Sequence, residues 1–157
     1  MMKKEQALNL MKAIKPIMDN DVIIFAYYKE RPVGFFVMLP ELNQLFRYVN
    51  GNLNWWGKLK FAWYRWRGKC RKLSGVVFGV TPEHQAKGVD SAMAAKTQEM
   101  YLRINRYDSM EMMWIGDFNP KMMKVARRVG GRKHRVFHTY RKLFDPNVPF
   151  ERHPIIK

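Results

Sequence analysis

The sequence predicts an α/β domain, and three observations support that class. Two apolar runs, residues 22–28 and 33–39, are separated by the turn sequence Lys-Glu-Arg-Pro, which is typical of a β-hairpin. A third run, residues 73–80, is rich in β-branched residues and leads through a short turn into a helix-forming run that ends at Ile104. The 157 residues are 47% apolar and 14% aromatic, so the chain can bury a core and is not a disordered tail.

The net charge of +16 is the most unusual feature of the composition. It indicates attraction to polyanions: nucleic acid, anionic lipid, acidic partners or phosphorylated cofactors such as coenzyme A (CoA). The single cysteine, Cys70, excludes an internal disulfide and fits a reducing compartment. We expect a cytoplasmic protein, because no apolar run reaches the length of a membrane span and the N-terminus lacks the apolar core of a signal peptide. The histidines show no metal-ligand spacing with carboxylates or the cysteine. His134 and His138 share one face of a predicted strand, where a metal pair can form but solvated histidines are commoner, so we expect no metal site.

Apolar periodicity defines the first elements. Residues 3–17 form a predicted amphipathic helix, which Pro16 and the polar residues 19–21 end. Its apolar face consists of Ala7, Leu10, Met11, Ile14 and Ile17 or Met18. The run 22–28 begins with consecutive apolar residues, so we expect a central strand of the sheet, paired with residues 33–39.

A long insert, residues 41–72, follows the hairpin and holds the densest basic and aromatic segment. Within it, residues 55–67 form a predicted helix with one apolar stripe, made of Trp56, Leu59, Trp63 and Trp66. One interpretation is a surface for nucleic acid or an anionic membrane, where Lys and Arg contact phosphates and Trp stacks or lies at the interface. We favour the other interpretation, in which the stripe packs on the sheet and the charges are solvated, because an apolar stripe at this spacing usually marks a core.

The strand 73–80 ends before Pro82, which cannot donate to a strand ladder. After the turn sequence 85–90, good helix formers continue to Ile104. Such a junction directs free backbone N–H groups and the positive end of the helix dipole toward one point, which is a phosphate site. Gly88 would let a phosphate approach the backbone, and Lys87 would add a charge. Spacing alone does not separate this site from an ordinary strand-to-helix connection.

The next elements follow from strand and cap signals. Residues 109–115 form a predicted strand that is rich in methionine. Asn119 is a good N-cap and Pro120 a good first helical residue, so residues 121–129 form a predicted helix. Gly130 ends this helix in the left-handed conformation.

The last part of the chain combines a strand and a loop. Residues 132–143 alternate as in a strand. The tail 145–157 contains three prolines and is a predicted irregular loop. We find no repeat and no linker, so we predict a single domain over residues 1–157.

Several of these segments carry a resemblance. Residues 85–90, Gln-Ala-Lys-Gly-Val-Asp, resemble the Gln/Arg-x-x-Gly-x-Gly/Ala pyrophosphate loop of the GNAT superfamily of N-acetyltransferases. Residues 32–35, Pro-Val-Gly-Phe, are similar to the start of the second hairpin strand in that superfamily. The residues that are similar to an uncharacterised bacterial branch of it are Glu111, Trp114, Asn119, Gly130 and the segment 40–44. The resemblance covers residues 21–143 and implies an α+β fold with a central mixed, mostly antiparallel sheet flanked by helices.

The resemblance also implies a reaction, the transfer of an acyl group from acetyl-CoA or another acyl-CoA to an amine. Backbone N–H groups would hold the pyrophosphate, and these belong to Gln85, Ala86, Lys87, Gly88, Val89 and Asp90. Phe78 and Val80 would contact the cofactor, with an N–H near Val80 polarising the thioester carbonyl. Asn119 would order the cofactor side of the cleft. The strand 109–115 would splay away from the strand 73–80, with the pantetheine arm between them.

Two side chains are candidates for moving protons. Glu111 would act as the base, directly or through water; the alternative is a rim carboxylate paired with a basic residue. Tyr140 would replace the acid, although a tyrosine on an alternating strand more often belongs to a core or rim. The tyrosine that the superfamily often has in its last helix falls at Ala126. Asp90 also departs from the pattern, which has Gly or Ala there.

Three functions stay open. The first is an N-acetyltransferase that acts on an unknown small-molecule or peptide amine. The second is a catalytically inactive relative that keeps the fold and the cofactor. The third is a basic nucleic-acid-binding module that uses residues 55–72, which we do not favour. Because the start is short for the superfamily, we also expect a truncated copy or a homodimer.

Overall fold

The computed structural model describes residues 4–145 and 147–156, except for the side chains of Lys4, Ala7, Leu10, Met11 and Ala13. The apolar face predicted for the first helix therefore lies mostly outside the described residues. The chain divides into two compact units, Met1–Met113 and Trp114–Lys157. The single domain over residues 1–157 stays a prediction.

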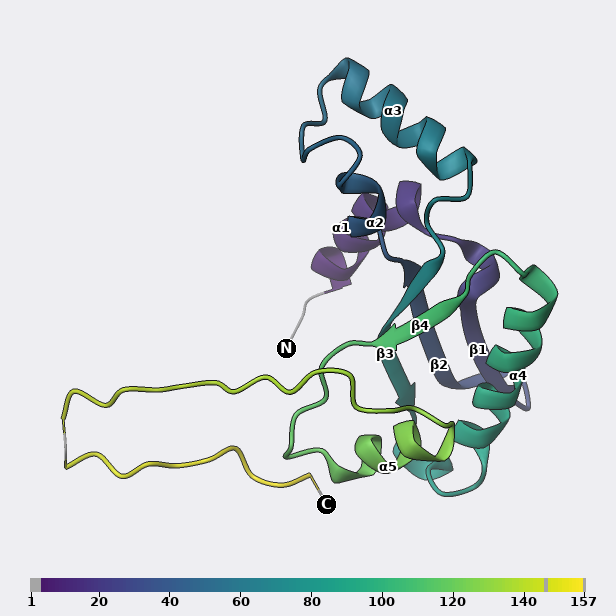
Figure 1. Ribbon diagram of the computed structural model, residues 1–157. Helices are drawn as coiled ribbons and strands as arrows, with labels where there is room; N and C mark the ends of the chain where they lie inside the picture. Colours follow the sequence, from purple (N-terminus) through teal and green to yellow (C-terminus); the bar gives the residue numbers. More distant parts are fainter. Residues whose placement is uncertain (1–3, 146, 157) are drawn as a thin grey trace. The chain divides into compact units, whose positions relative to one another are not determined.

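A four-stranded sheet forms the centre of the first unit (Figure 1). Across the sheet the strands follow in the order β1 (Ile23–Tyr28), β2 (Arg31–Pro40), β3 (Lys72–Val80) and β4 (Ser109–Met112). β1 pairs with β2 and β2 with β3 in the antiparallel direction, whereas β3 and β4 are parallel. The predicted mixed, mostly antiparallel sheet is confirmed.

β1 and β2 form the predicted hairpin around a two-residue turn. Lys29 and Glu30 have φ angles of 47° and 64°, the left-handed conformation that the tightest hairpin turns require at both central residues. β1 lies at the edge of the described sheet and not in its centre, so that prediction is wrong. Phe25, Tyr27 and Tyr28 are each more than half exposed. An apolar run indicates that a strand has a buried face, but it does not say how many strands pair with it.

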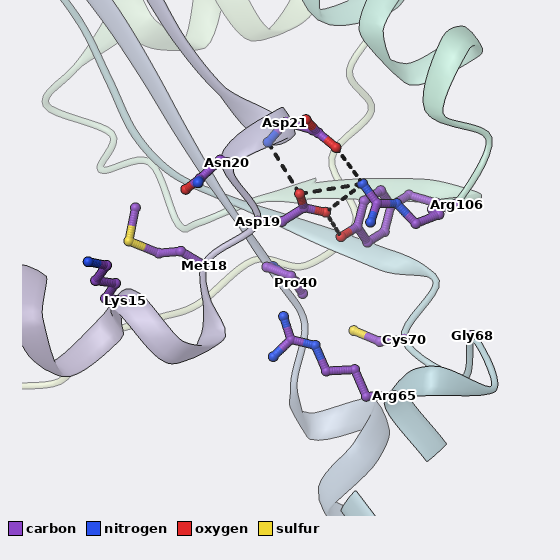
Figure 2. A pocket seen from close by; sticks show the side chains of 11 residues that line it. Lys15, Met18, Asp19, Asn20, Asp21, Pro40, Arg65, Gly68, Cys70 and Arg106 are labelled. Atoms are coloured by element: carbon purple, nitrogen blue, oxygen red, sulfur yellow. Dashed lines mark hydrogen bonds and ion pairs between the residues drawn. The ribbon is translucent and has the colours of Figure 1, made fainter. Parts of the chain in front are cut away.

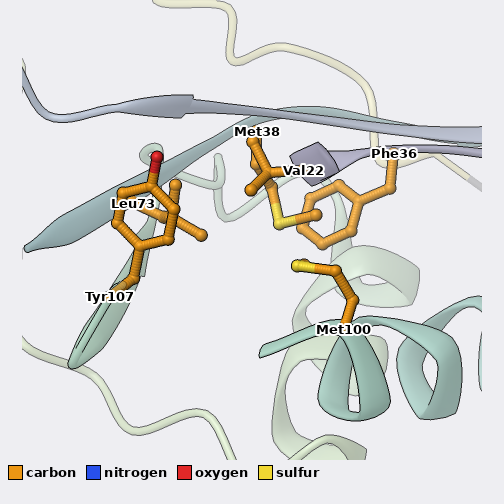
Figure 3. Close-up of a cluster of buried hydrophobic side chains, with 6 residues drawn as sticks. All are labelled: Val22, Phe36, Met38, Leu73, Met100 and Tyr107. Atoms are coloured by element: carbon orange, nitrogen blue, oxygen red, sulfur yellow. The ribbon is translucent and has the colours of Figure 1, made fainter. Parts of the chain in front are cut away.

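The core lies between the sheet and α4 (Val89–Ile104), which packs on β1 and β2. Six buried side chains form one cluster: Val22, Phe36, Met38, Leu73, Met100 and Tyr107 (Figure 3). In Figure 3, Met100 points from α4 toward Phe36 and Met38. The Phe36 ring also meets the Phe78 ring edge-on, with ring centres 5.4 Å apart. This packing fixes the strand β3 and the start of α4 in one body.

Shorter helices surround the sheet in the first unit. The N-terminal helix ends near Pro16, as predicted, because α1 passes there into a 3₁₀ turn. These helices are α1 (Lys4–Ile14), η1 (Lys15–Ile17), η2 (Asn20–Val22), α2 (Asn43–Phe46) and η3 (Pro82–His84).

α3 (Trp55–Trp66) is the helix predicted in the insert, but its tryptophan stripe is not buried on the sheet. Trp56 and Trp66 are 71% and 77% exposed. α3 packs instead on α2, beyond the end of the sheet (Figure 1), through Phe61 and Tyr64. The favoured interpretation, a stripe packed on the sheet, is therefore wrong. Periodicity identifies a helix and its stripe, but it does not identify the neighbour that the helix meets.

The second unit contains the helix α5 (Pro120–Arg128). The side chain of Asn119 accepts a hydrogen bond from the N–H of Met122 at 3.1 Å, which is the predicted N-cap. Gly130 follows the helix with a φ angle of 83°, which is the predicted left-handed end.

The segment 132–143 contains no strand, so that prediction is wrong. All but one of its residues are exposed, and no described residue pairs with it in a ladder. The chain runs outward from α5 and turns back toward Ile156, whose N–H donates to the carbonyl of Phe118 at 2.8 Å (Figure 1). Alternation alone does not make a strand, because the backbone groups also need a neighbouring strand.

Candidate functional site

The junction between β3 and α4 is a chain of consecutive turns over residues 81–88. Ala86 and Gly88 have φ angles of 60° and 82°, so the backbone is left-handed at two positions of this loop. Alternation between right- and left-handed residues turns neighbouring N–H groups toward one concave side, and such concavities bind anions. The positive end of the α4 dipole lies at the same place.

The first turn of α4 has no side-chain cap. Gly88 occupies the N-cap position and makes no capping hydrogen bond. In the described part of the chain, the N–H groups of Val89 and Ser91 donate to no backbone carbonyl. A Cβ built on Gly88 would meet no atom within 4 Å, so the space above it is open. Asp90, half-buried in the same turn, has interactions of its own within the protein. The amides beside Gly88 are thus available to an anion.

Two side chains hold the loop from within. The Nε2 of Gln85 donates to the carbonyl of Val80 at 3.2 Å. The Oγ1 of Thr81 lies 3.1 Å from the Nδ1 of His84. Gln85 therefore ties the loop to the end of β3 through its side chain. Its backbone N–H donates to the carbonyl of Pro82 at 3.3 Å, so this amide is already engaged within the loop.

A cavity of about 350 Å³ opens beside the loop. Tyr27 and Tyr28 line it from β1, and Lys87 and Val89 line it from the loop and the start of α4. The ring of His84 lies 5.5 Å from that of Tyr28 and closes one side. Lys87 therefore adds a positive charge next to the amides at the start of α4.

β3 continues beyond its pairing with β4. The parallel register ends at Gly75 and Met112, and one further bond joins the N–H of Met113 to the carbonyl of Gly75 at 2.9 Å. β4 is therefore shorter than the predicted strand 109–115. Within the described register, residues 76–80 of β3 have no partner on the β4 side.

Two backbone amides of β3 point to this unpaired edge. Thr81 donates its N–H to the carbonyl of Val33 on β2 at 2.8 Å. Because successive residues of a strand direct their backbone groups to opposite edges, the N–H groups of Phe78 and Val80 point away from β2. An extended molecule could pair with this edge as an added strand does.

A β-bulge lies where β3 and β4 separate. The β2–β3 register passes from Val77 directly to Gly75 and leaves Val76 without an opposite residue. Bulges leave a backbone group unpaired and are common next to active sites. Sequence reasoning missed this feature, although Gly75 lies beside the bulge and a glycine inside a strand often marks one.

Glu111 lies on β4, opposite Ser74 in the register, and forms an ion pair with Lys72. Its side chain is 32% exposed. Val80 lies about six residues further along β3, so Glu111 and Val80 are separated by roughly 20 Å along the strand. The structure therefore does not bring Glu111 together with the amide of Val80.

Glu41, which the resemblance included in the segment 40–44 without giving it a role, belongs to the same polar cluster. Its Oε2 accepts a hydrogen bond from the Oγ of Ser74 at 2.8 Å, and its Oε1 accepts one from the Nδ2 of Asn43 at 2.7 Å. Ser74 is only 6% exposed. A carboxylate directly after a strand is a weak signal, and nothing in the sequence links Glu41 to Ser74.

Asn119 and Tyr140 belong to the second unit, so their predicted roles beside the loop stay predictions. The side-chain oxygen of Asn119 is already engaged in the cap of α5. Tyr140 is 90% exposed and lies in the segment that forms no strand.

A second cavity, of about 570 Å³, is lined by residues 15 and 18–21 before β1, by Cys70 before β3, and by Arg106 and Tyr107 after α4 (Figure 2). Its polar groups pair with one another: Tyr107 donates to Asp19 at 2.6 Å, and Arg106 contacts both Asp19 and Asp21. Burial raises the pKa of the Cys70 thiol in its wall, which disfavours the reactive thiolate. No group of three His, Cys, Asp or Glu side chains in the described residues is placed to hold a metal ion.

Two curated proteins are similar to this chain in sequence. Protein YghO of Escherichia coli (strain K12) is 26% identical over 133 residues, which cover 82% of this chain and 34% of that protein. Bacterial ceramide synthase of Caulobacter vibrioides (strain NA1000 / CB15N) is 26% identical over 144 residues, 85% of this chain and 35% of that protein. The chain thus spans about a third of the length of these relatives. No protein-family model matches it.

Solved structures match this chain over most of their own length, unlike the two relatives in sequence. AAC(6′)-Iy in complex with the bisubstrate analogue CoA-S-monomethyl-acetylneamine superimposes with a TM-score of 0.57 at 17% identity, over 90% of this chain and 82% of that one. The same aminoglycoside N-acetyltransferase in complex with CoA gives a TM-score of 0.53 at 19% identity, over 90% of this chain and 96% of that one. No helix in the described residues combines the length and apolarity that crossing a bilayer requires. The chain has the acyl-CoA N-acyltransferase fold of the GNAT superfamily.

Proposed function

We propose that the chain binds acyl-CoA at the loop 85–90 and transfers the acyl group to an amine. The observation that carries this proposal is the uncapped first turn of α4, which follows a strand with an unpaired edge through the loop 81–88. The fold supports it, because AAC(6′)-Iy with the same fold was solved in complex with CoA.

The dimensions of this region fit the cofactor. The amides at Gly88 and Val89 would hold the pyrophosphate, with Lys87 supplying a full charge. Between the phosphate and the sulfur of CoA lie about twelve bonds, which span roughly 14 Å when extended. The edge of β3 from Val80 to Val76 is of the same length, at about 3.4 Å per residue. The thioester would therefore lie near the bulge at Val76 and not at Val80.

This position gathers the groups that acyl transfer needs. Bound acyl-CoA supplies a thioester, whose acyl carbon forms a bond to the amine nitrogen while the carbon–sulfur bond breaks. A backbone N–H of β3 beside the bulge would stabilise negative charge on the carbonyl oxygen. Glu111, which lies next to this end of β3, would accept the proton that the amine loses, directly or through water. Its partner Lys72 holds the carboxylate in place. Tyr140 stays the proposed donor of the proton that the leaving sulfur takes up.

The chemical class of the acceptor amine can also be proposed. One relative is named a ceramide synthase, and ceramide is an amide of a fatty acid and a long-chain amine. The analogue bound to AAC(6′)-Iy joins CoA to an aminoglycoside, which is also an amine. We therefore propose a primary amine as the acceptor and long-chain lipid amines as the first class to test.

Calorimetric titration of the 157-residue chain with acetyl-CoA and with a long-chain acyl-CoA tests the binding site. Gly88→Ala should weaken binding by about tenfold or more, because its Cβ would enter the open space above the amides. Gly51→Ala is the matched control: Gly51 also has a left-handed φ angle, 70°, and no atom within 4 Å of a built Cβ. Equal binding by the two variants, or no heat with either ligand, would contradict the site.

Thiol release from acyl-CoA in the presence of amines tests catalysis separately. Glu111→Gln should reduce turnover by about 100-fold or more with unchanged acyl-CoA binding, since it removes the base. Glu99→Gln is the control, because it also removes a carboxylate paired with a lysine, Lys96, but on the exposed side of α4. If acyl-CoA binds but no amine is acylated, the chain is the catalytically inactive relative that keeps the fold and the cofactor.

A further inference from the structure

The outer face of α3 is a continuous apolar surface that nothing in the described structure covers. Its members, which we call the exposed Trp face, are Trp55, Trp56, Leu59, Trp63 and Trp66, with exposed fractions of 72%, 71%, 46%, 52% and 77%. Four tryptophans exposed to this degree present on the order of 500 Å² of aromatic surface. A patch of that size on one helix usually marks an interaction site.

The opposite face of α3 fixes the direction in which the tryptophans point. Phe61 packs against Phe46 with ring centres 5.4 Å apart, and Tyr64 stacks on Tyr48 at 4.2 Å. Gly57 is buried on the same side, where a Cβ would lie 1.9 Å from a backbone oxygen. α3 therefore packs on the rest of the first unit through Gly57, Phe61 and Tyr64, and the exposed Trp face points away from it.

Basic residues flank this face, and the stretch of sequence that contains it has no acidic residue. At 3.6 residues per turn, Lys58 and Lys60 lie about 100° to either side of the middle of the face. The sequence from Leu42 to Pro82 contains no Asp or Glu. Its basic residues are Arg47, Lys58, Lys60, Arg65, Arg67, Lys69, Arg71 and Lys72.

We propose that the exposed Trp face of α3 docks on the surface of an anionic lipid bilayer. A helix with tryptophans on one side and lysines at both flanks matches an interfacial helix, which lies in the membrane plane with its apolar face among the acyl chains. The lysines would then meet anionic headgroups. The inference goes beyond the proposed acyl transfer and does not require it.

Two other occupants fit the surface less well. A second copy of the chain would bring together two acid-free basic segments from molecules of net charge +16, which repel each other. Nucleic acid favours basic side chains that track a backbone between stacking rings. Here the rings of Trp63 and Trp66 lie 5.2 Å apart in one apolar strip. Arg67 lies 5.7 Å from the centre of the Trp63 ring, and both lysines lie outside the strip.

Co-sedimentation of the 157-residue chain with vesicles tests the proposal. Vesicles of phosphatidylcholine with phosphatidylglycerol should bind the chain at low salt, and pure phosphatidylcholine should bind it much more weakly. Trp56→Gln with Trp66→Gln should lower the affinity for the anionic vesicles by about tenfold or more, because less apolar surface enters the bilayer. Lys58→Gln with Lys60→Gln should lower it by roughly thirtyfold, in a salt-dependent way.

One variant of the second unit is the control. Trp114 is 73% exposed but lies outside α3, so Trp114→Gln should bind vesicles like the unchanged chain. Failure to bind anionic vesicles at low salt would overturn the proposal, as would full binding by the double tryptophan variant. Salt-dependent retention of DNA or RNA, lost in that variant while vesicles stay unbound, would assign the face to nucleic acid instead. A concentration-dependent dimer that the variant abolishes would assign it to a second copy.

Discussion

α3 and α4 both carry an apolar stripe at helical spacing, but only α4 buries it. Met93 and Met100 of α4 are 2% and 3% exposed against the sheet, whereas Trp56 and Trp66 of α3 are mostly exposed. The first turns differ as well. In α3 the side chain of Asn54 accepts the N–H of Gly57 at 2.8 Å, whereas α4 begins without a side-chain cap.

Helix formation and burial of the apolar stripe are two separate properties, although one sequence pattern is used to predict both. A stripe predicts that a helix forms, but the surface that it meets depends on elements elsewhere in the chain. α4 follows β3 through a short loop, so it returns onto the sheet that β3 belongs to. α3 lies in an insert between β2 and β3 and packs on α2 and on Tyr48 beyond it, with a hydrogen bond from Arg65 to the carbonyl of Pro16 at 3.1 Å. We therefore assign stability to the stripe of α4 and binding to the stripe of α3.

Truncating one side chain in each stripe should give the largest difference in the free energy of unfolding. Met100→Ala should lower the free energy of unfolding by about 3 kcal/mol, because it leaves a cavity beside Phe36 and Met38. Trp66→Ala should change it by less than about 0.5 kcal/mol, because Trp66 is exposed. Urea unfolding followed by far-ultraviolet circular dichroism measures both. Equal losses would mean that α3 buries its stripe in solution, and the assignment of binding would fail.

A smaller effect should come from the cap that α3 has and α4 lacks. Asn54→Ala removes the acceptor for the N–H of Gly57, which should cost about 1 kcal/mol of stability. The loss should be the same with and without saturating acyl-CoA, because α3 is not part of the proposed cofactor site. Thermal unfolding at both conditions measures it. A loss that appears only with acyl-CoA would place α3 in that site.

Local signals explain which elements could be predicted from the sequence. The hairpin followed from its turn residues, and α5 followed from Asn119 at its start and Gly130 at its end. The turn between β3 and α4 followed from Pro82 and the residues 85–90, where Gly88 has a left-handed φ angle. Each of these signals lies within a few residues of the structure that it describes.

The features that the sequence could not predict depend on distant partners. The segment 132–143 alternates like a strand but has no described strand beside it. The bulge at Val76 is defined by the register with β2, and the pairing of Glu111 with Lys72 is defined by the register with β4. The distance between Glu111 and Val80 follows from that register as well. The sequence therefore named candidate site residues, but not the arrangement that decides which of them could act together.

The smallest effect concerns Tyr107, which follows α4 and belongs to the same buried cluster as Met100. Burial and then the hydrogen bond to Asp19 raise the pKa of Tyr107 well above its ordinary value near 10. A raised pKa means that this stabilisation is complete below about pH 10 and is lost as the pH rises toward the folded-state pKa. Between pH 9 and 10.5 the unchanged chain should lose about 0.8 kcal/mol more stability than Tyr107→Phe.

Urea midpoints of the two proteins at both pH values measure this difference. The raised pKa of Cys70 also reduces stability in alkali, but both proteins contain Cys70, so its contribution cancels. Parallel losses in the two proteins would mean that Tyr107 ionises as easily in the folded chain as in the unfolded one. In that case the end of α4 would be open to solvent, and the contrast with α3 would hold only for the part of the helix before Met100.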